Sequence, residues 1–368
     1  MRTIRRLIYR EVVASIVFVA AGFLALFFFF DLVDELPKVG RGAAGSVYTM
    51  SQALGFVTLM VPNHLYELLP IAVLIGTIFV MARLAQSSEY TILRTSGLGP
   101  WRALRTLLGL GAIFTVLTFA TGDYLAPVAD RTAQLLKARH EGRLSIGQTG
   151  AWLKERQSFN TYNVNVNALS PEGDMRGIRI FEADARGFLV SVTQAPRGRF
   201  ASDGSWTLLD AERSEFTTQG SLAKVERIKV PSMRWPTEIS PEMVSVALLK
   251  PDRMSTIDLF QYIQHLDANG QTSQRYEIEF WRKVFYPLSC MVMVVLALPF
   301  AYLHFRSGGI TSYVFGGVLI GISFFLLNNV FGYIGNLQNW WPWLTAASPG
   351  LIYTLFSLGA FGWLVLRR

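Results

Sequence analysis

The sequence predicts a polytopic α-helical membrane protein with six transmembrane helices and an inserted β-jellyroll-like domain. Six apolar runs reach membrane-spanning length, and three of them lie on each side of a long polar middle. In that middle the apolar residues alternate with polar ones, which is typical of half-buried strands. The composition agrees, because 51% of residues are hydrophobic and only 16% are charged, whereas about a quarter are charged in an average soluble chain.

The six predicted spans follow from length, since a bilayer core of roughly 30 Å needs about 20 apolar residues in a helix. They are Val12 to Phe30, Leu68 to Leu84 with a leader from Ala53, Leu104 to Tyr124, Phe285 to Leu303, Ile310 to Ile334 and Leu344 to Leu366. We therefore divide the chain into residues 1–126 with three spans, the polar middle 127–274, and residues 275–368 with three more.

The orientation follows from the lysines and arginines of the short loops. The ends and loops on one side carry Arg2, Arg5, Arg6, Arg10, Arg83, Arg94, Arg102, Arg105, Arg306, Arg367 and Arg368. The opposite short loops carry only Lys38 and Arg41, so both termini are predicted to be cytoplasmic and the middle domain to lie outside. A cleaved signal peptide is the alternative for the first run, but no A-x-A-like site precedes Asp31.

Three other features of the sequence limit the kinds of site and partner that we expect. Trp340, Trp341 and Trp343 cluster where the sixth span begins, as expected for an aromatic belt at the outer interface. Cys290 is the single cysteine, which excludes an internal disulfide and a cysteine metal site. The net charge of +8 could indicate nucleic acid, but topology explains it and we predict no nucleic-acid partner.

The middle domain is predicted to be a β-sandwich or jelly roll. Alternating segments occur at 159–166, 177–182, 188–192, 206–209 and 222–230, and the turn signals between them include Pro171-Glu-Gly-Asp, Pro196-Arg-Gly and Asp203-Gly. Helices are predicted at 129–140 and at 255–267, where Ser255 and Asp258 form a capping-box pattern. In the second helix one face holds Leu259, Phe260, Ile263 and Leu266, and it is predicted to pack on the sheet or on the bilayer surface.

Motifs for chemistry are largely missing from the sequence. It contains no GxxxxGK[ST], HExxH, CxxC or GxSxG, so we predict no catalytic residue, cofactor or metal site of those kinds. The span centres are almost free of ionisable residues, with Glu67 the nearest exception. Glu67 lies between Pro62 and Pro70 and can either sit at the membrane edge or belong to a transport pathway.

The short polar segment between the second and third spans predicts a cytoplasmic helix over about 87–97. Ser87 or Ser88 can cap it, with an acid in the first turn and a glycine at the end. The residues that could dock on a partner are Glu89, Tyr90, Leu93, Arg94 and Gly97. A solvated loop helix without a partner is the alternative.

Two features of the apolar spans, a group of glycines and a run of phenylalanines, can each be interpreted in two ways. Gly316, Gly317 and Gly321 in the fifth span provide close helix approach, either within the chain or at a subunit interface or gate. The run Phe27 to Phe30 is lipid-facing bulk or a wall for acyl chains.

Local strings of the sequence resemble the LptF/LptG permeases of the lipopolysaccharide-export ABC transporter, and they resemble LptG more than LptF. They are FFDLVDELPKVGRG, ELLPIAVLIGT, LAQSSEYTILRTSGL, GDYLAP, VALLKPDRMS and RYEIEFWRKVFYPLS. The order of parts also resembles that family, whose β-domain is periplasmic. The resemblance implies an inner-membrane permease subunit without enzymatic activity. Its implied partners are a second LptF-like permease, an LptB-like cytoplasmic ATPase dimer and an LptC-like jellyroll protein.

The resemblance also implies roles for particular residues. Glu89 matches the acidic residue of the coupling helix that faces the ATPase. Acyl chains of lipopolysaccharide would meet a cavity with gates formed by the first span of one subunit and the fifth span of the other. The residues of this chain that would line the cavity and gates are Leu24, Phe27, Phe28, Gly317, Gly321, Phe324 and Phe331. Phosphates of lipid A would meet Lys38 and Arg41, whereas Asp31 and Pro37 stand where the family can carry basic residues.

Three other classes remain as alternatives. A mechanotransmission-type ABC permease would often have four spans, and a membrane-bound enzyme would need a catalytic cluster. If the chain is a non-transporting scaffold or receptor, no ATPase should respond to substitution of Glu89.

Overall fold

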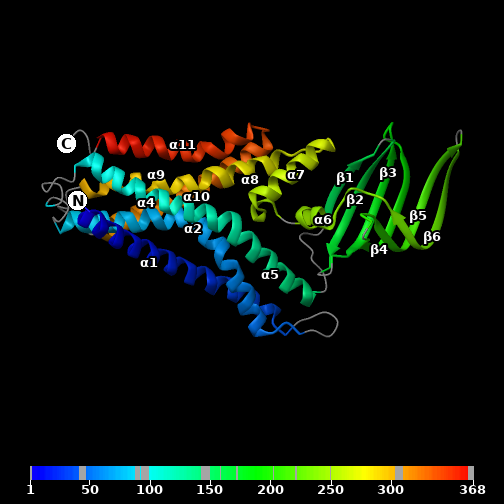
Figure 1. The fold of residues 1–368 in the computed structure, drawn as a ribbon, viewed down its shortest axis with the longest axis horizontal. Helices are drawn as coiled ribbons and strands as arrows, with labels where there is room; N and C mark the ends of the chain where they lie inside the picture. The colour runs from blue at the N-terminus through cyan, green and yellow to red at the C-terminus, as the bar shows by residue number, and fades with distance from the viewer. Residues whose placement is uncertain are drawn as a thin grey trace. The chain divides into compact units, whose positions relative to one another are not determined.

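The structure, a computed structural model, describes residues 2–40, 47–87, 92, 99–141, 150–157, 159–170, 173–201, 203–219, 222–248, 250–302 and 310–363. The chain divides into two compact units. The first comprises Met1–Asp34, Val57–Ala129 and Glu277–Arg368, and the second comprises Glu35–Phe56 and Asp130–Tyr276. The first unit is helical, and the second contains the sheet (Figure 1).

Helices long and apolar enough to cross a bilayer number six within the described part of the chain, which confirms the predicted spans. The long helices are α1 (Arg2–Glu35), α2 (Met50–Gln86), α4 (Pro100–Ala120), α5 (Ala126–Glu141), α8 (Gln274–Phe285), α9 (Ser289–Ala297), α10 (Ile310–Leu337) and α11 (Pro342–Phe361). A π-turn, η2 (Thr121–Leu125), joins α4 to α5, and two 3₁₀ turns, η4 (Tyr286–Leu288) and η5 (Leu298–Tyr302), flank α9.

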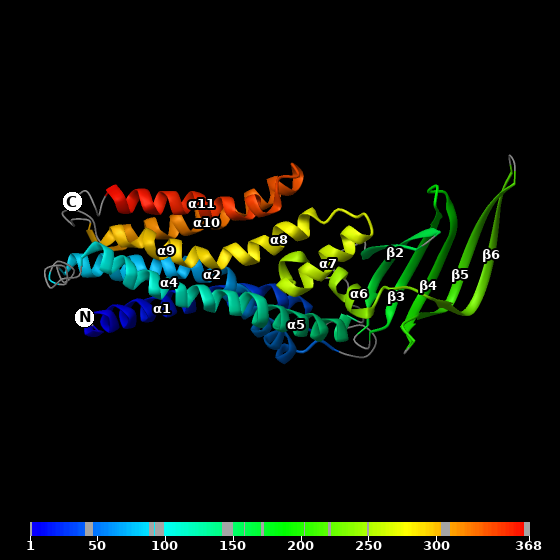
Figure 2. The same cartoon turned by 45° about the horizontal axis from the view of Figure 1, so that its top comes forward.

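The second span forms the centre of the first unit. Its apolar window is 83% buried, whereas those of α1 and α10 are each 17% buried. Glycine makes the close packing possible, because a Cβ at Gly76 would lie 2.8 Å from the backbone of Ile16 in α1. The spans run side by side in both views of the fold (Figure 1 and Figure 2). The helix continues through Pro62 and Pro70, so the predicted leader from Ala53 belongs to the same continuous helix.

The second unit contains a six-stranded antiparallel sheet, which confirms the inserted β-domain. Its strands are β1 (Ala151–Arg156), β2 (Asn160–Leu169), β3 (Met175–Asp184), β4 (Leu189–Phe200), β5 (Trp206–Gln219) and β6 (Leu222–Trp235). They pair in sequence order without crossovers, so β1 and β6 lie at the two edges (Figure 1). The sequence pattern missed β1.

The core of the second unit lies between one face of the sheet and the helices α6 (Pro241–Leu248) and α7 (Thr256–Ala268), with the 3₁₀ turn η3 (Pro251–Arg253) between them. Trp206 is fully buried and donates its indole N–H to the carbonyl of Ile239 at 2.6 Å. Ser255 and Asp258 form the predicted capping box at the start of α7.

The buried face of α7 differs from the predicted one. It consists of Leu259, Tyr262 and Leu266, which recur at helical spacing. Phe260 is 51% exposed, so it does not pack on the sheet, and its packing on the bilayer surface stays a prediction. A step of one residue turns a helix by about 100°, which carries Phe260 away from the stripe that faces the sheet.

Pro196 lies inside β4, so the prediction of a turn there was wrong. It belongs to a transverse row of irregular positions. The strand registers pair the residues on both sides of this row but skip five positions, which therefore follow one another across the sheet: Asn167, Gly177, Pro196, Asp210 and Pro231. Gly177 and Asp210 have φ of 62° and 51°, and proline cannot donate to a ladder. We call these five residues the sheet row.

At the sheet row two consecutive residues of β4, Pro196 and Arg197, face away from the core, whereas the strand alternates before and after them. The same break occurs in β3 at Arg176 and Gly177. At the row, β3 and β4 therefore exchange the side of the strand that faces the core for the side that faces away from it. The proline resembled a turn signal because strand prediction assumes unbroken alternation.

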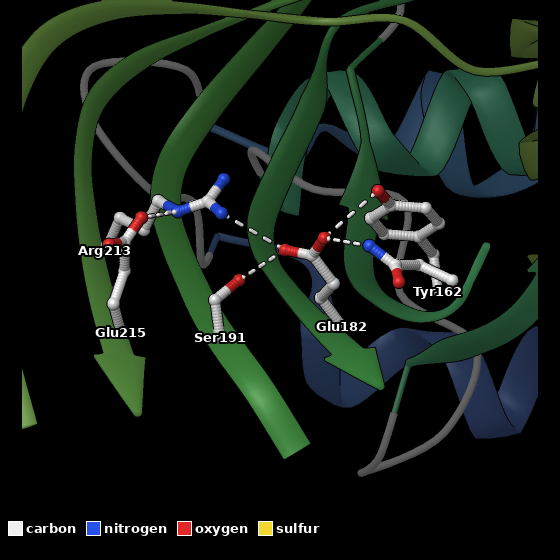
Figure 3. A network of polar contacts seen from close by, with 6 residues as sticks. Tyr162, Glu182, Ser191, Arg213 and Glu215 are labelled. Atoms are coloured by element: carbon white, nitrogen blue, oxygen red, sulfur yellow. Dashed lines mark hydrogen bonds and ion pairs between the residues drawn. The ribbon is translucent and has the colours of Figure 1, made fainter. Parts of the chain in front are cut away.

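Towards one end the buried face of the sheet becomes polar. Glu182 is 7% exposed and follows Ile180 on that face. Its carboxylate accepts hydrogen bonds from Asn160, Tyr162 and Ser191, and it pairs with Arg213 at 3.1 Å (Figure 3). Because four donors converge on it, the charge of Glu182 is well compensated.

Candidate functional site

The predicted coupling residues Glu89, Tyr90, Leu93, Arg94 and Gly97 lie outside the described residues. The structure does fix what precedes and follows them, because α2 ends at Gln86 and α4 begins at Pro100. Residues 87–99 therefore connect the second span to the third. Near this end Arg83 of α2 pairs with Glu11 of α1 at 2.5 Å.

The predicted phosphate contact Lys38 is engaged by an acid of its own chain. Its ammonium lies 2.5 Å from the carboxylate of Glu35, which is 3% exposed and also accepts a hydrogen bond from the Tyr48 hydroxyl at 3.2 Å. Lys38 keeps 44% of its side chain exposed. An incoming phosphate would therefore compete with Glu35 for this cation. Arg41 lies outside the described residues.

Asp31 is not an isolated charge. Its carboxylate lies 2.6 Å from Nε2 of His64 in α2. The ring of Phe27 in α1 packs on the same imidazole, with 5.0 Å between ring centroids. The first span is thus fixed to the second by a polar contact and an aromatic contact one helical turn apart.

The predicted acyl-chain wall residues occupy different environments. In α1, Leu24 and Phe28 are half-buried and Phe27 is exposed. In α10, Phe331 is half-buried against Trp340. Phe324 is 1% exposed and lies between the rings of Tyr286 and Tyr353, so this chain already encloses it.

The predicted gate glycines pack within the chain. A Cβ at Gly317 would lie 2.8 Å from Ile78, and one at Gly321 would lie 2.8 Å from Ile71, both in α2. Gly316 faces open space, with nothing within 4 Å of the place that a Cβ would take there. Gly317 and Gly321 therefore hold the fifth span against the second.

A buried lysine that the sequence reasoning missed lies in the fourth span. Lys283 of α8 is 6% exposed and donates to the carbonyl of Gly122 in η2 at 3.0 Å. The neighbouring Arg282 pairs with Glu279 at 2.8 Å and reaches Asn329 of α10. The apolar run begins at Phe285, whereas the helix begins at Gln274, so both cations lie outside the predicted span.

The second unit carries a cleft of about 460 Å³ beside α6 and α7. Arg131 and Asp258, which form an ion pair, lie on its wall together with Gln261, Tyr262 and His265. Burial lowers the pKa of His265 below its ordinary value of 6.5. Within the described ranges no three side chains of the metal-binding types gather into a candidate ion site.

Comparison with known proteins decides the family. The family model described as lipopolysaccharide export system permease LptF/LptG matches residues 6–367. The chain belongs to the LptF/LptG family. The match runs through both units, so the LptF/LptG architecture includes the sheet as well as the six spans.

Relatives within the LptF/LptG family are similar over nearly their whole length. The lipopolysaccharide export system permease protein LptG of Escherichia coli K12 is 28% identical over 339 residues, which cover 91% of this chain and 90% of that protein. The LptG protein of Haemophilus influenzae is 25% identical over 376 residues, which cover 100% of this chain and 99% of that protein.

Proposed function

We propose that this chain is the LptG-type permease subunit of an ABC transporter. The transporter extracts lipopolysaccharide from the outer leaflet of the inner membrane and passes it to a periplasmic bridge. The observation that supports this most is the family match over residues 6–367, together with six spans and a central antiparallel sheet. Both termini are cytoplasmic in this proposal and the sheet is periplasmic, in keeping with the arginines of the short loops.

The energy comes from a separate LptB-like ATPase dimer, because the sequence has no P-loop of its own. Residues 87–99 dock on that partner, with Glu89 facing a basic residue and Tyr90, Leu93 and Arg94 completing the contact. The position of this segment between α2 and α4 supports the proposal, since both helices continue from it into the centre of the first unit.

A second, LptF-like permease encloses the lipid together with this chain. The first and fifth spans support this role, because they bury the least of their apolar surface and expose large side chains such as Phe18, Phe29 and Phe315. An exposed apolar face of this size needs lipid or another subunit against it. Leu24, Phe27 and Phe28 belong to the same helix and contribute to the acyl-chain wall.

The sheet offers an edge for the LptC-like partner. β6 is an edge strand of 14 residues, and an unpaired edge is a template for another chain's strand. Phosphates of lipid A are bound by Lys38 and Arg41, with Glu35 as an internal competitor for Lys38.

Co-purification tests the transporter proposal. The tagged chain is isolated from its own cells in mild detergent, and co-purifying proteins are identified by mass spectrometry. We expect an ABC-type ATPase and a second six-span subunit. Glu89→Lys should lose the ATPase because a cation then faces the partner's basic residue. Glu238→Lys, a charge reversal at an exposed position outside the strands, is the control. Recovery of the chain alone would favour the scaffold or receptor alternative.

A further inference from the structure

Two of the strings that carry the family resemblance meet at one place in the first unit, beside the residue that precedes a third string. GDYLAP contributes Gly122 of the π-turn η2, ELLPIAVLIGT follows directly on Tyr66 of α2, and RYEIEFWRKVFYPLS contributes Lys283 of α8. The coupling, gating and phosphate roles proposed above do not use these residues. Their convergence therefore needs a separate explanation.

Lys283 is the centre of this cluster. Its side chain is almost fully buried, its ammonium donates to the Gly122 carbonyl at 3.0 Å, and the same ammonium lies 5.7 Å from the centroid of the Tyr66 ring. An ammonium inside a membrane helix bundle is costly unless hydrogen-bond acceptors and counter-charges are arranged around it. The carbonyl and the aromatic face are two such partners, and the aromatic face attracts a cation through the ring quadrupole.

The carbonyl that Lys283 binds belongs to an unusual backbone element. Residues Thr121–Leu125 form a π-turn between α4 and α5, and such turns interrupt the regular α-helical ladder, often at functional positions. Gly122 has no space for a side chain, because a Cβ there would overlap the Tyr66 ring. The ring thus packs directly on the backbone of the turn, and Lys283 joins both from a third helix.

The cluster ties together helices that lead away from the coupling segment. Residues 87–99 lie between α2 and α4, and the cluster fixes α2 to the far end of α4. A second contact supports it, since the hydroxyl of Tyr286 in η4 donates to the carbonyl of Glu67 at 2.5 Å. The second, third and fourth spans are therefore joined at one point beyond their midlengths.

We propose that Lys283 is a positioning residue for transport, which locks the second, third and fourth spans so that they move as one body when residues 87–99 are displaced. The inference rests on the proposed function. Without the lock, a displacement of the coupling segment would be absorbed by separate movement of α2 and α4. ATP hydrolysis would then continue while less lipid is extracted for each ATP.

The test uses the complete transporter in proteoliposomes, with ATP hydrolysis and lipopolysaccharide release measured in the same sample. Lys283→Met keeps the length of the side chain and removes its charge and donors. We expect ATP hydrolysis within about twofold of wild type and release per ATP reduced at least fivefold. Lys250→Met, at an exposed position next to η3, is the matched control and should change neither quantity.

Two substitutions of Tyr66 keep the inference testable if Lys283→Met does not assemble. Tyr66→Phe retains the ring face and should leave release per ATP unchanged, whereas Tyr66→Leu removes it and should reduce the ratio. A fall of hydrolysis and release in parallel, or an unchanged ratio in Lys283→Met or Tyr66→Leu, would overturn the positioning role. A wild-type complex without ATP-dependent release would instead overturn the proposed function.

Discussion

Replacement of Glu35 by glutamine should strengthen the binding of phosphorylated lipid A. The carboxylate of Glu35 holds the Lys38 ammonium at 2.5 Å, so a phosphate that binds Lys38 must first displace it. Glutamine removes the negative charge, and its side-chain oxygen can still accept the hydrogen bond from Tyr48. The substitution therefore releases the cation with little change in local structure.

The size of the effect follows from the exposure of the pair. Lys38 is 44% exposed, although Glu35 is buried, and ion pairs with an exposed partner contribute about 0.5–1 kcal/mol. A gain of that size corresponds to roughly two- to fivefold tighter binding. Because solvent screens the pair, the effect should shrink as salt is raised.

The assay is a lipid titration of the purified transporter in nanodiscs, with bisphosphorylated lipid A and its dephosphorylated form as ligands. Glu35→Gln should lower the Kd for the first and leave that for the second unchanged. Lys38→Met in the Glu35→Gln background should abolish the gain. Equal or weaker binding of the phosphorylated lipid by a folded Glu35→Gln variant would refute the competition between Glu35 and phosphate.

Two further predictions concern the stability of the β-domain. Glu182→Ala should destabilise it by about 3 kcal/mol, because four donors including Arg213 lose their buried acceptor. Glu215→Ala, whose carboxylate is 44% exposed, is the control and should cost under about 1 kcal/mol in denaturant unfolding. Burial lowers the pKa of His265, so the unfolded chain binds a proton more readily and stability should fall as pH drops below about 6.5. His265→Gln should reduce the difference between the unfolding midpoints at pH 7.5 and pH 5, and an unchanged difference would contradict this.

The six spans were predictable because length and hydropathy report directly on the bilayer. Their ends were not, since backbone hydrogen bonding carries a helix beyond its apolar run. α2 begins at Met50 and α8 at Gln274, both before the predicted spans. This is why Lys283 was overlooked: in a linear sequence it appears as a charge at a membrane edge, and only the packing of three helices shows that it is buried.

In the β-domain most strands were predictable from alternation, and β1 and the continuous β4 were not. Pro196 resembles a turn signal in sequence, but its neighbours in β3 and β5 have the positive φ angles that accommodate an irregular row. Such compensation involves residues that are far apart along the chain. The pairing of Lys38 with Glu35 and of Asp31 with His64 likewise depends on side-chain distances that spacing alone does not determine.

The sheet row also constrains how the strands can change in length. The row exchanges the buried and exposed faces at the same level in neighbouring strands. One residue inserted into or deleted from β3 alone would therefore put the half of β3 that begins at Ile178 out of phase with its partners in β2 and β4. Apolar side chains of that half would then face water, and polar ones would enter the core. Substitutions can therefore accumulate in one strand at a time. The number of residues, in contrast, can change only in all strands that cross the sheet row together, or in the turns between them.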